Sequence, residues 1–186
     1  MESGYRVWVL PCQTLSHCQM TIDSQKREQF ESCVRDCADS IYRVAYRLSG
    51  NETLARELVQ ETYLNAWKSL DRLSDPAKTR SWMFAILRNQ FSKLIRKESK
   101  AVVTSVEFDE PVEKELPDTE TQEAVQNAVQ SLDEAHRLPI LLVSMEGMSV
   151  EEAAEILELP KGTVLSRLHR ARQKLKETLS RDLMKA

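Results

Sequence analysis

Residues 149–172 read SVEEAAEILELPKGTVLSRLHRAR, a pattern typical of two short helices joined by a tight turn. Ser149 and Glu152 have the spacing of a capping box, in which each side chain satisfies a backbone N–H at a helix start. The adjacent small residues Ala153 and Ala154 allow a second helix to cross closely. Pro160 then marks the turn before that second helix. The segment therefore predicts a helix-turn-helix.

The second helix of this motif carries an unusual run of positive charge. Residues 161–176 contain six basic side chains and no acidic one. Arginine suits bidentate contacts to guanine, and both lysine and arginine neutralise phosphate. A charge run alone is more often a solvated helix face. The capped start, the turn and the absence of acids together favour DNA binding.

Composition points to an all-α protein. The 186 residues include 41% hydrophobic side chains but only four glycines and six prolines, too few turn-forming residues for a β-sandwich or barrel. No apolar run approaches the ~20 residues of a membrane helix. Residues 5–10 are too short an apolar stretch for a signal peptide, so we expect a cytoplasmic protein with reduced thiols and no membrane contact.

The net charge of −3 hides an uneven distribution along the chain. Residues 22–104 carry +4 and residues 136–186 carry +2, whereas residues 105–135 carry −9. Two basic segments are thus joined by a strongly acidic one.

Helical periodicity and turn residues divide the chain into parts. We expect a flexible N-terminal extension over residues 1–21, a helical domain over 22–100, an acidic flexible linker over 101–120 and a second helical domain over 121–186. The expected helices cover residues 27–50, 53–70 and 79–97, then a stretch from residue 121, and finally 135–145, 149–157 and 161–183. Gly50 is placed as a helix stop.

Three strings of sequence resemble one known family. Residues 149–172, and above all Gly162–Val164 with Ser166–Arg172, resemble the region-four helix-turn-helix of extracytoplasmic-function sigma factors. Residues 55–67, ARELVQETYLNAW, resemble the core-polymerase-binding segment of region two. Residues 81–89, SWMFAILRN, resemble the start of its promoter-melting segment. The resemblance covers nearly all of residues 25–180, with both regions in the expected order.

This resemblance implies a promoter-specificity subunit of bacterial RNA polymerase rather than an enzyme. Region two would grip the clamp helices of the β′ subunit and capture unstacked bases of the minus-ten element, which promotes strand opening. Region four would bind the β flap and read the minus-thirty-five element as duplex. An anti-sigma factor is a further implied partner.

The resemblance also implies binding residues. For the minus-thirty-five element they are Lys161, Thr163, Ser166, Arg167, His169, Arg170 and Gln173. For the minus-ten element they are Arg80, Arg88, Asn89, Lys93, Arg96 and Lys97, with the loop 69–79 as the wall of a pocket for an extruded base. For core polymerase they are Glu57, Gln60, Glu61 and Asn65. Leu165 departs from the family, which often has a basic residue there, and Lys93 stands where an aspartate is common.

Other readings of the sequence are weaker. No Gly-rich phosphate loop or HExxH motif supports an enzyme, and we expect no cofactor. The four cysteines, Cys12, Cys18, Cys33 and Cys37, form no CxxC pair, so we expect no metal site and interpret the helical ones as small buried hydrophobes. Trp82 and Phe84 suit the core better than base stacking. A helix-turn-helix regulator without polymerase remains the main alternative, but it leaves the pattern over residues 53–100 unexplained. A protein-interaction adaptor is the third class.

Overall fold

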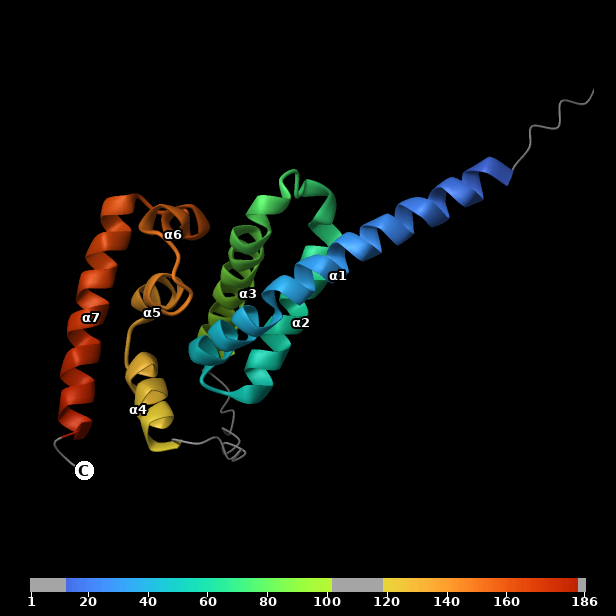
Figure 1. Ribbon diagram of the computed structural model, residues 1–186. Coiled ribbons are helices and arrows are strands. Elements are labelled where there is room, and N and C mark those ends of the chain that lie inside the picture. The colour runs from blue at the N-terminus through green and yellow to red at the C-terminus, as the bar shows by residue number, and fades with distance from the viewer. Residues whose placement is uncertain (1–12, 102–118, 184–186) are drawn as a thin grey trace, which may run out of the picture.

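The computed structural model describes residues 13–101 and 119–183, and the side chains of residues 24–97 and 122–180 within them. These parts are helical and contain no β-strand. Figure 1 shows the helices as two groups lying side by side, with the first half of α1 projecting away from both. We call α1–α3 the N-terminal unit and α4–α7 the C-terminal unit. No described helix is long and apolar enough to cross a membrane.

The N-terminal unit is a bundle of α1 (Gln13–Ser49), α2 (Glu52–Ser69) and α3 (Thr79–Ala101). Helix α1 stops where the sequence predicts, because Gly50 adopts a φ of +71°, which glycine tolerates without strain. Asn51 then begins α2, and its side chain accepts a hydrogen bond from the Leu54 backbone N–H at 3.1 Å. Two 3-10 turns, Leu70–Arg72 and Pro76–Lys78, connect α2 to α3.

The C-terminal unit contains α4 (Thr119–Gln130), α5 (Glu134–Ile140), α6 (Val150–Leu157) and α7 (Lys161–Leu183). The predicted capping box is present: the Ser149 hydroxyl accepts from the Glu152 backbone N–H at 3.1 Å, and the Glu152 carboxylate accepts from the Ser149 N–H at 2.8 Å. Glu158 closes α6 in the left-handed conformation, with φ of 53°. The helix-turn-helix therefore has the predicted bounds to within one residue.

The single helix predicted over residues 135–145 is wrong in its second half. Pro139 lies inside α5 and has no N–H to donate, which weakens the regular hydrogen-bond ladder there. The chain continues as a π-helical turn, Leu141–Met145, closed by the Glu146 N–H donating to the Leu141 carbonyl at 3.1 Å. Gly147, with φ of +66°, then redirects the chain toward α6.

Two further expectations concern the ends of the elements. Helix α1 begins at Gln13 and thus includes the last nine residues of the expected extension, whereas residues 1–12 lie outside the described residues. Helix α3 reaches Ala101, four residues beyond the predicted end. The acidic linker, residues 102–118, also lies outside the described residues.

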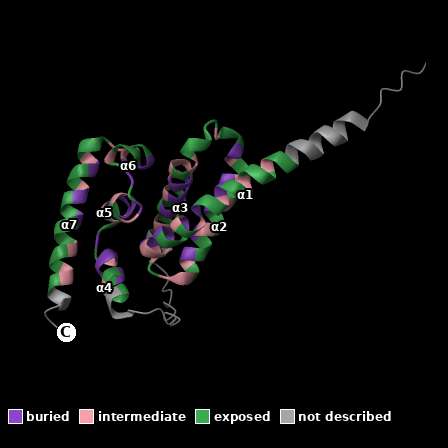
Figure 2. Ribbon diagram, viewed as in Figure 1, coloured by how far each residue is buried: buried purple, intermediate pink, exposed green. Residues whose placement is uncertain are grey.

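The two units pack against each other through α3 on α6 and through α1 on α4 and the π-helical turn. Figure 2 shows buried residues on the facing sides of both groups, and the buried apolar side chains form one cluster that includes residues of both units. Largest among the fully buried residues are Phe84, Ile41 and Leu48 of the N-terminal unit and Leu142 of the C-terminal unit. The burial of Phe84 confirms its placement in the core.

Candidate nucleic-acid and polymerase interfaces

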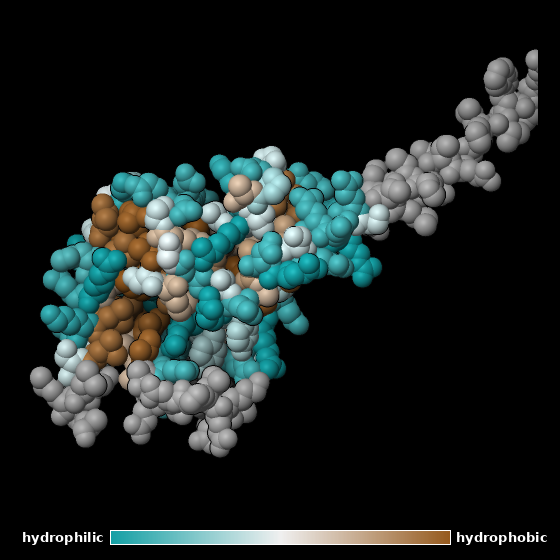
Figure 3. Space-filling view, in the orientation of Figure 1, coloured by the Kyte–Doolittle hydropathy of each residue, from teal (hydrophilic) through white to brown (hydrophobic). Residues whose placement is uncertain are grey.

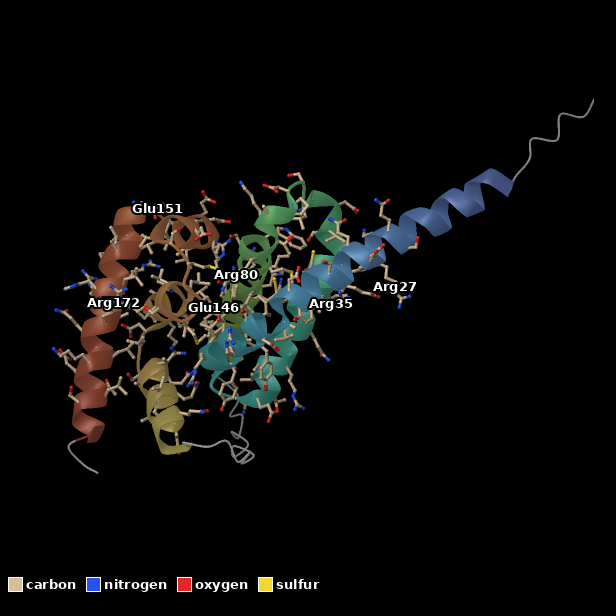
Figure 4. The ribbon with its side chains drawn as sticks, viewed as in Figure 1. Arg27, Arg35, Arg80, Glu146, Glu151 and Arg172 are labelled. Carbon is tan, nitrogen blue, oxygen red and sulfur yellow. The ribbon has the colours of Figure 1, made fainter. Side chains whose placement is uncertain are left out.

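Helix α7 presents one face to the core and another to solvent. Val164, Leu168 and Ala171 are buried, as their spacing predicts. Apart from Leu165, the exposed side chains on the rest of the helix are polar or basic, and Arg172 points away from the molecule in Figure 4. The residues predicted to contact duplex DNA are all at least partly exposed. The exposed ones are Lys161, Ser166, His169, Arg170 and Gln173, and the half-buried ones are Thr163 and Arg167. The helix thus combines a firmly packed inner face with an exposed outer face that contains no acid over residues 161–176.

Two residues, Lys161 and Leu165, make this outer face less basic than its sequence indicates. Lys161 forms an ion pair with Glu151 of α6, and its hydrogen bond holds the pKa of that carboxyl below the ordinary value. Leu165 is 49% exposed and adds apolar surface among the polar residues. Figure 3 shows hydrophobic surface gathered near α7 and the helices beside it, while the face of the N-terminal unit is mostly hydrophilic.

A pocket of about 530 Å³ opens between the end of α2 and the middle of α3. It brings together Asn89, Lys93 and Arg96, three of the residues predicted to bind the minus-ten element. Its other lining residues come from both helices and from the turn after α2: Asn65, Lys68, Ser69, Arg72, Trp82, Ala85, Ile86 and Gln90. Its size falls in the range of small-ligand pockets, about 300–1,000 Å³.

Sequence reasoning missed part of this pocket. Lys68 adds a cationic group from α2 that the sequence reasoning did not name. Of the loop 69–79, which was predicted as the pocket wall, Ser69 and Arg72 line the pocket. Half-buried Trp82 also lines the wall, although its sequence pattern favours the core. A helix that places Asn65 on one face also places Lys68 there, one turn later, so the periodicity of α2 contained the signal. The pocket therefore combines cations with an aromatic ring and an amide, a set that suits single-stranded nucleic acid.

Arg80 and Arg88, also predicted to bind the minus-ten element, turn instead toward the C-terminal unit. An Arg80 N–H donates to the Glu146 carboxylate at 2.8 Å, and an Arg88 N–H donates to the Glu158 carboxylate at 2.6 Å. Neither arginine lines the pocket. Lys97, the last residue of this set, is exposed near the end of α3.

The outward face of α2 carries the predicted polymerase contacts. Glu57, Gln60 and Glu61 are exposed, whereas Asn65 is half-buried at the pocket and donates to the Glu61 carbonyl at 2.7 Å. Leu64 lies on this face as well and is 45% exposed, which the sequence reasoning missed. An exposed leucine among carboxylates and amides is typical of a surface that receives a partner helix.

Two cysteines of α1, Cys33 and Cys37, are buried. Cys33 and Cys37 are 5% and 2% exposed, and burial raises the pKa of the Cys37 thiol. Within the described part of the chain, no three His, Cys, Asp or Glu side chains are grouped so as to hold a metal ion. Cys12 and the side chain of Cys18 lie outside the described residues.

Each of the two units matches a known protein family. Residues 33–101 match the family model for Sigma-70 region 2, and residues 122–175 match that for Sigma-70 region 4. The ECF RNA polymerase sigma factor SigE of Mycolicibacterium smegmatis is 32% identical over 169 residues, which cover 87% of this chain; the chain spans 65% of that protein's length. The ECF sigma factor EcfG of Rhodopseudomonas palustris is 34% identical over 77% of this chain and 81% of its own length.

Solved structures agree with this assignment. The sigma factor RpoE of Bartonella quintana, in complex with the anti-sigma factor NepR, matches with a TM-score of 0.73 and 29% identity over 81% of this chain and 96% of that one. CnrH, in complex with the cytosolic domain of CnrY, matches with a TM-score of 0.63 and 29% identity over 82% of this chain and 88% of that one. The chain is therefore a member of the extracytoplasmic-function family of RNA polymerase sigma factors.

Proposed function

We propose that this sigma factor directs core RNA polymerase to promoters by reading the minus-thirty-five element with α7 and the minus-ten element with the pocket between α2 and α3. In this assignment residues 22–100 act as the region-two domain and residues 121–186 as the region-four domain, joined by the linker 101–120. The observation that carries the proposal is that one chain holds both a basic, acid-free helix-turn-helix face and a separate cationic pocket with an aromatic wall.

The duplex-reading role rests on the outer face of α7. Arg170 and Gln173 lie one turn apart on this face, and both are exposed. An arginine can donate two hydrogen bonds to guanine and a glutamine can bind adenine, so this pair suits the major groove. Lys161, Thr163, Ser166, Arg167 and His169 would supply the remaining base or phosphate contacts.

The single-strand role rests on the pocket. Asn89 offers both a donor and an acceptor to a base edge, and Trp82 offers a ring surface for stacking. Lys68, Arg72 and Lys93 would balance the adjoining phosphates. Extruding a base costs a few kcal/mol, which these contacts must offset.

The polymerase role rests on the outward face of α2, with Glu57, Gln60 and Glu61 around the exposed Leu64. We propose that this face binds the β′ clamp helices and that the C-terminal unit binds the β flap. An anti-sigma factor is a further expected partner, because the sigma factor RpoE, which is similar to this chain, was solved in complex with the anti-sigma factor NepR. The chain would act as an initiation factor and leave RNA synthesis to the polymerase.

Run-off transcription tests this proposal directly. Core polymerase with the purified chain should transcribe a subset of templates from a library with a randomised promoter region, and the transcribed templates should share two separated elements. Core polymerase alone should not select them. A chain that binds duplex DNA but never changes which templates core polymerase transcribes would instead be a regulator acting without polymerase.

A second test separates base reading from general charge. Arg170→Ala should weaken binding to a selected minus-thirty-five duplex by about 1–3 kcal/mol if Arg170 contacts a base, and by less if it contacts only phosphate. The matched control is Arg27→Ala, which also removes one exposed arginine but lies on α1, where Arg27 pairs with Glu31 (Figure 4). Equal binding by both variants and the wild type would remove Arg170 from the interface.

A further inference from the structure

Leu165 is an apolar side chain on the otherwise polar outer face of α7. It is 49% exposed, and no other large apolar side chain among the described residues is as exposed. It lies outside the buried apolar cluster, so the fold does not use it as a core residue. The contacts proposed above for duplex DNA are all polar and leave this leucine without a role.

The position of Leu165 on the helix brings it close to the predicted base contacts. It lies in the second turn of α7, which begins at Lys161. The N-terminal residues of the second helix in a helix-turn-helix are the ones that contact base edges. Residues three and four apart are neighbours on a helix surface, so Leu165 lies beside Gly162 and His169, both of which are exposed. Leu165 therefore borders the same exposed row as the residues proposed to read DNA.

The surface next to Leu165 is open and weakly charged. Gly162 has no side chain, and no other side chain comes within 4 Å of the position that a Cβ on it would take. Lys161, one turn before Leu165, already forms an ion pair with Glu151 of α6. A base edge can therefore approach the leucine without meeting a bulky side chain or an unpaired lysine.

A leucine recognises apolar groups, and the major groove of DNA offers one. Thymine projects its C5-methyl group into that groove, where the bases otherwise present mainly hydrogen-bond donors and acceptors. A helix with its side chains is about 10–12 Å across and the groove is about 12 Å wide, so residues on the flank of the helix also meet base edges. The thymine methyl group is thus the part of duplex DNA that Leu165 suits.

We propose that Leu165 is a specificity-determining residue for the minus-thirty-five element and that it packs against the methyl group of one thymine. This contact makes the element prefer thymine at that position, while Arg170 and Gln173 read the hydrogen-bonding atoms of other base pairs. The inference rests on the proposed reading of duplex DNA by α7.

The test uses the full chain and a duplex with the selected minus-thirty-five element, in which each thymine in turn is replaced by deoxyuridine. Deoxyuridine keeps the hydrogen-bonding atoms of thymine and lacks only its methyl group. Burial of one such group corresponds to about a fourfold change in affinity, so one replacement should weaken binding by the wild type about threefold to fivefold. With Leu165→Ala the same replacement should change the affinity by less than about 1.5-fold, because the shortened side chain no longer buries the methyl group.

Two further variants separate this contact from general effects on binding. Val125→Ala is the matched control, because Val125 is also an exposed aliphatic residue of the C-terminal unit but lies on α4. It should keep the full deoxyuridine effect. Leu165→Arg replaces the apolar contact by a charge that attracts phosphate, so it should bind with a steeper dependence on salt and lose the deoxyuridine effect.

Equal sensitivity of the wild type and Leu165→Ala to every replacement, or no sensitivity in the wild type, would overturn the proposal. A Leu165→Ala variant that binds the duplex normally but supports less transcription with core polymerase would also overturn it, since Leu165 would then contact protein. If Arg170→Ala weakens binding and the deoxyuridine effect is absent, the assignment of Leu165 fails while the proposed function stands. If the wild type prefers no duplex sequence at all, the proposed function itself fails.

Discussion

Gly50 offers a quantitative test of how the two units fit together. It ends α1 with φ of +71°, and a Cβ built on it would lie 2.9 Å from Cδ and 3.0 Å from Nε2 of the Gln130 side chain. That side chain belongs to α4 and donates to the carbonyls of Arg47 and Leu48 at 2.8 and 3.2 Å. Gln130 thus caps the C-terminal end of α1 from the other unit. Gly50→Ala should disturb both the local backbone and this cap.

The cost has two parts. Placing alanine in the left-handed region costs about 1–2 kcal/mol. Displacing Gln130 removes two hydrogen bonds worth about 0.5–1.5 kcal/mol each. The free energy of unfolding should therefore fall by about 2–5 kcal/mol. Gly147→Ala provides the comparison, because Gly147 has φ of +66° but no atom within 4 Å of its would-be Cβ. It should lose only the backbone part.

Urea unfolding followed by circular dichroism at 222 nm measures these changes for Gly50→Ala, Gln130→Ala and the double variant. If the methyl group acts through Gln130, Gly50→Ala should cost about 1–3 kcal/mol less when Gln130 is already absent. Additive effects of the two substitutions would refute the steric argument. Equal losses for Gly50→Ala and Gly147→Ala would also contradict it, since only Gly50 meets a neighbouring side chain.

Three further predictions address the core, the capping box and the polymerase surface. Leu142→Ala should lower the free energy of unfolding by about 2–5 kcal/mol, measured by urea unfolding, because Leu142 is fully buried. Hydrogen bonds from Ser149 lower the pKa of Glu152 from its ordinary value of 4.5. The ionised carboxyl therefore stabilises the folded state above pH 4.5, and this contribution is lost as the pH falls through the lowered pKa. The difference in free energy of unfolding between wild type and Glu152→Gln should be larger at pH 7 than at pH 3. Glu61→Arg should weaken co-purification with core polymerase while leaving binding to the minus-thirty-five duplex unchanged, and equal core binding would remove Glu61 from that surface.

Local interactions explain why the helix-turn-helix could be predicted so closely from sequence. Ser149 and Glu152 satisfy each other's backbone within one turn, and the buried residues Val164 and Leu168 follow the period of a single helix. Such features depend on neighbours three or four residues away. Pro139 was the local signal that could have revealed the end of α5, but a proline weakens a helix without specifying the π-helical turn that follows.

The partners of the arginines could not be predicted in the same way. Arg80 and Glu146 are 66 residues apart in sequence, and Arg88 and Glu158 are 70 apart. A count of charges by segment assigns all four residues to basic parts of the chain, where the acids are a minority. Only the packing of α3 on α6 brings these minority acids to the arginines.

The positions of these acids also explain why charge alone is an incomplete guide to DNA binding here. A guanidinium donates hydrogen bonds to a carboxylate or a phosphate with similar geometry, so a basic residue suited to DNA is equally suited to an acid of its own chain. In this structure Glu146 and Glu158 take up hydrogen bonds from Arg80 and Arg88, two residues that the sequence assigned to DNA.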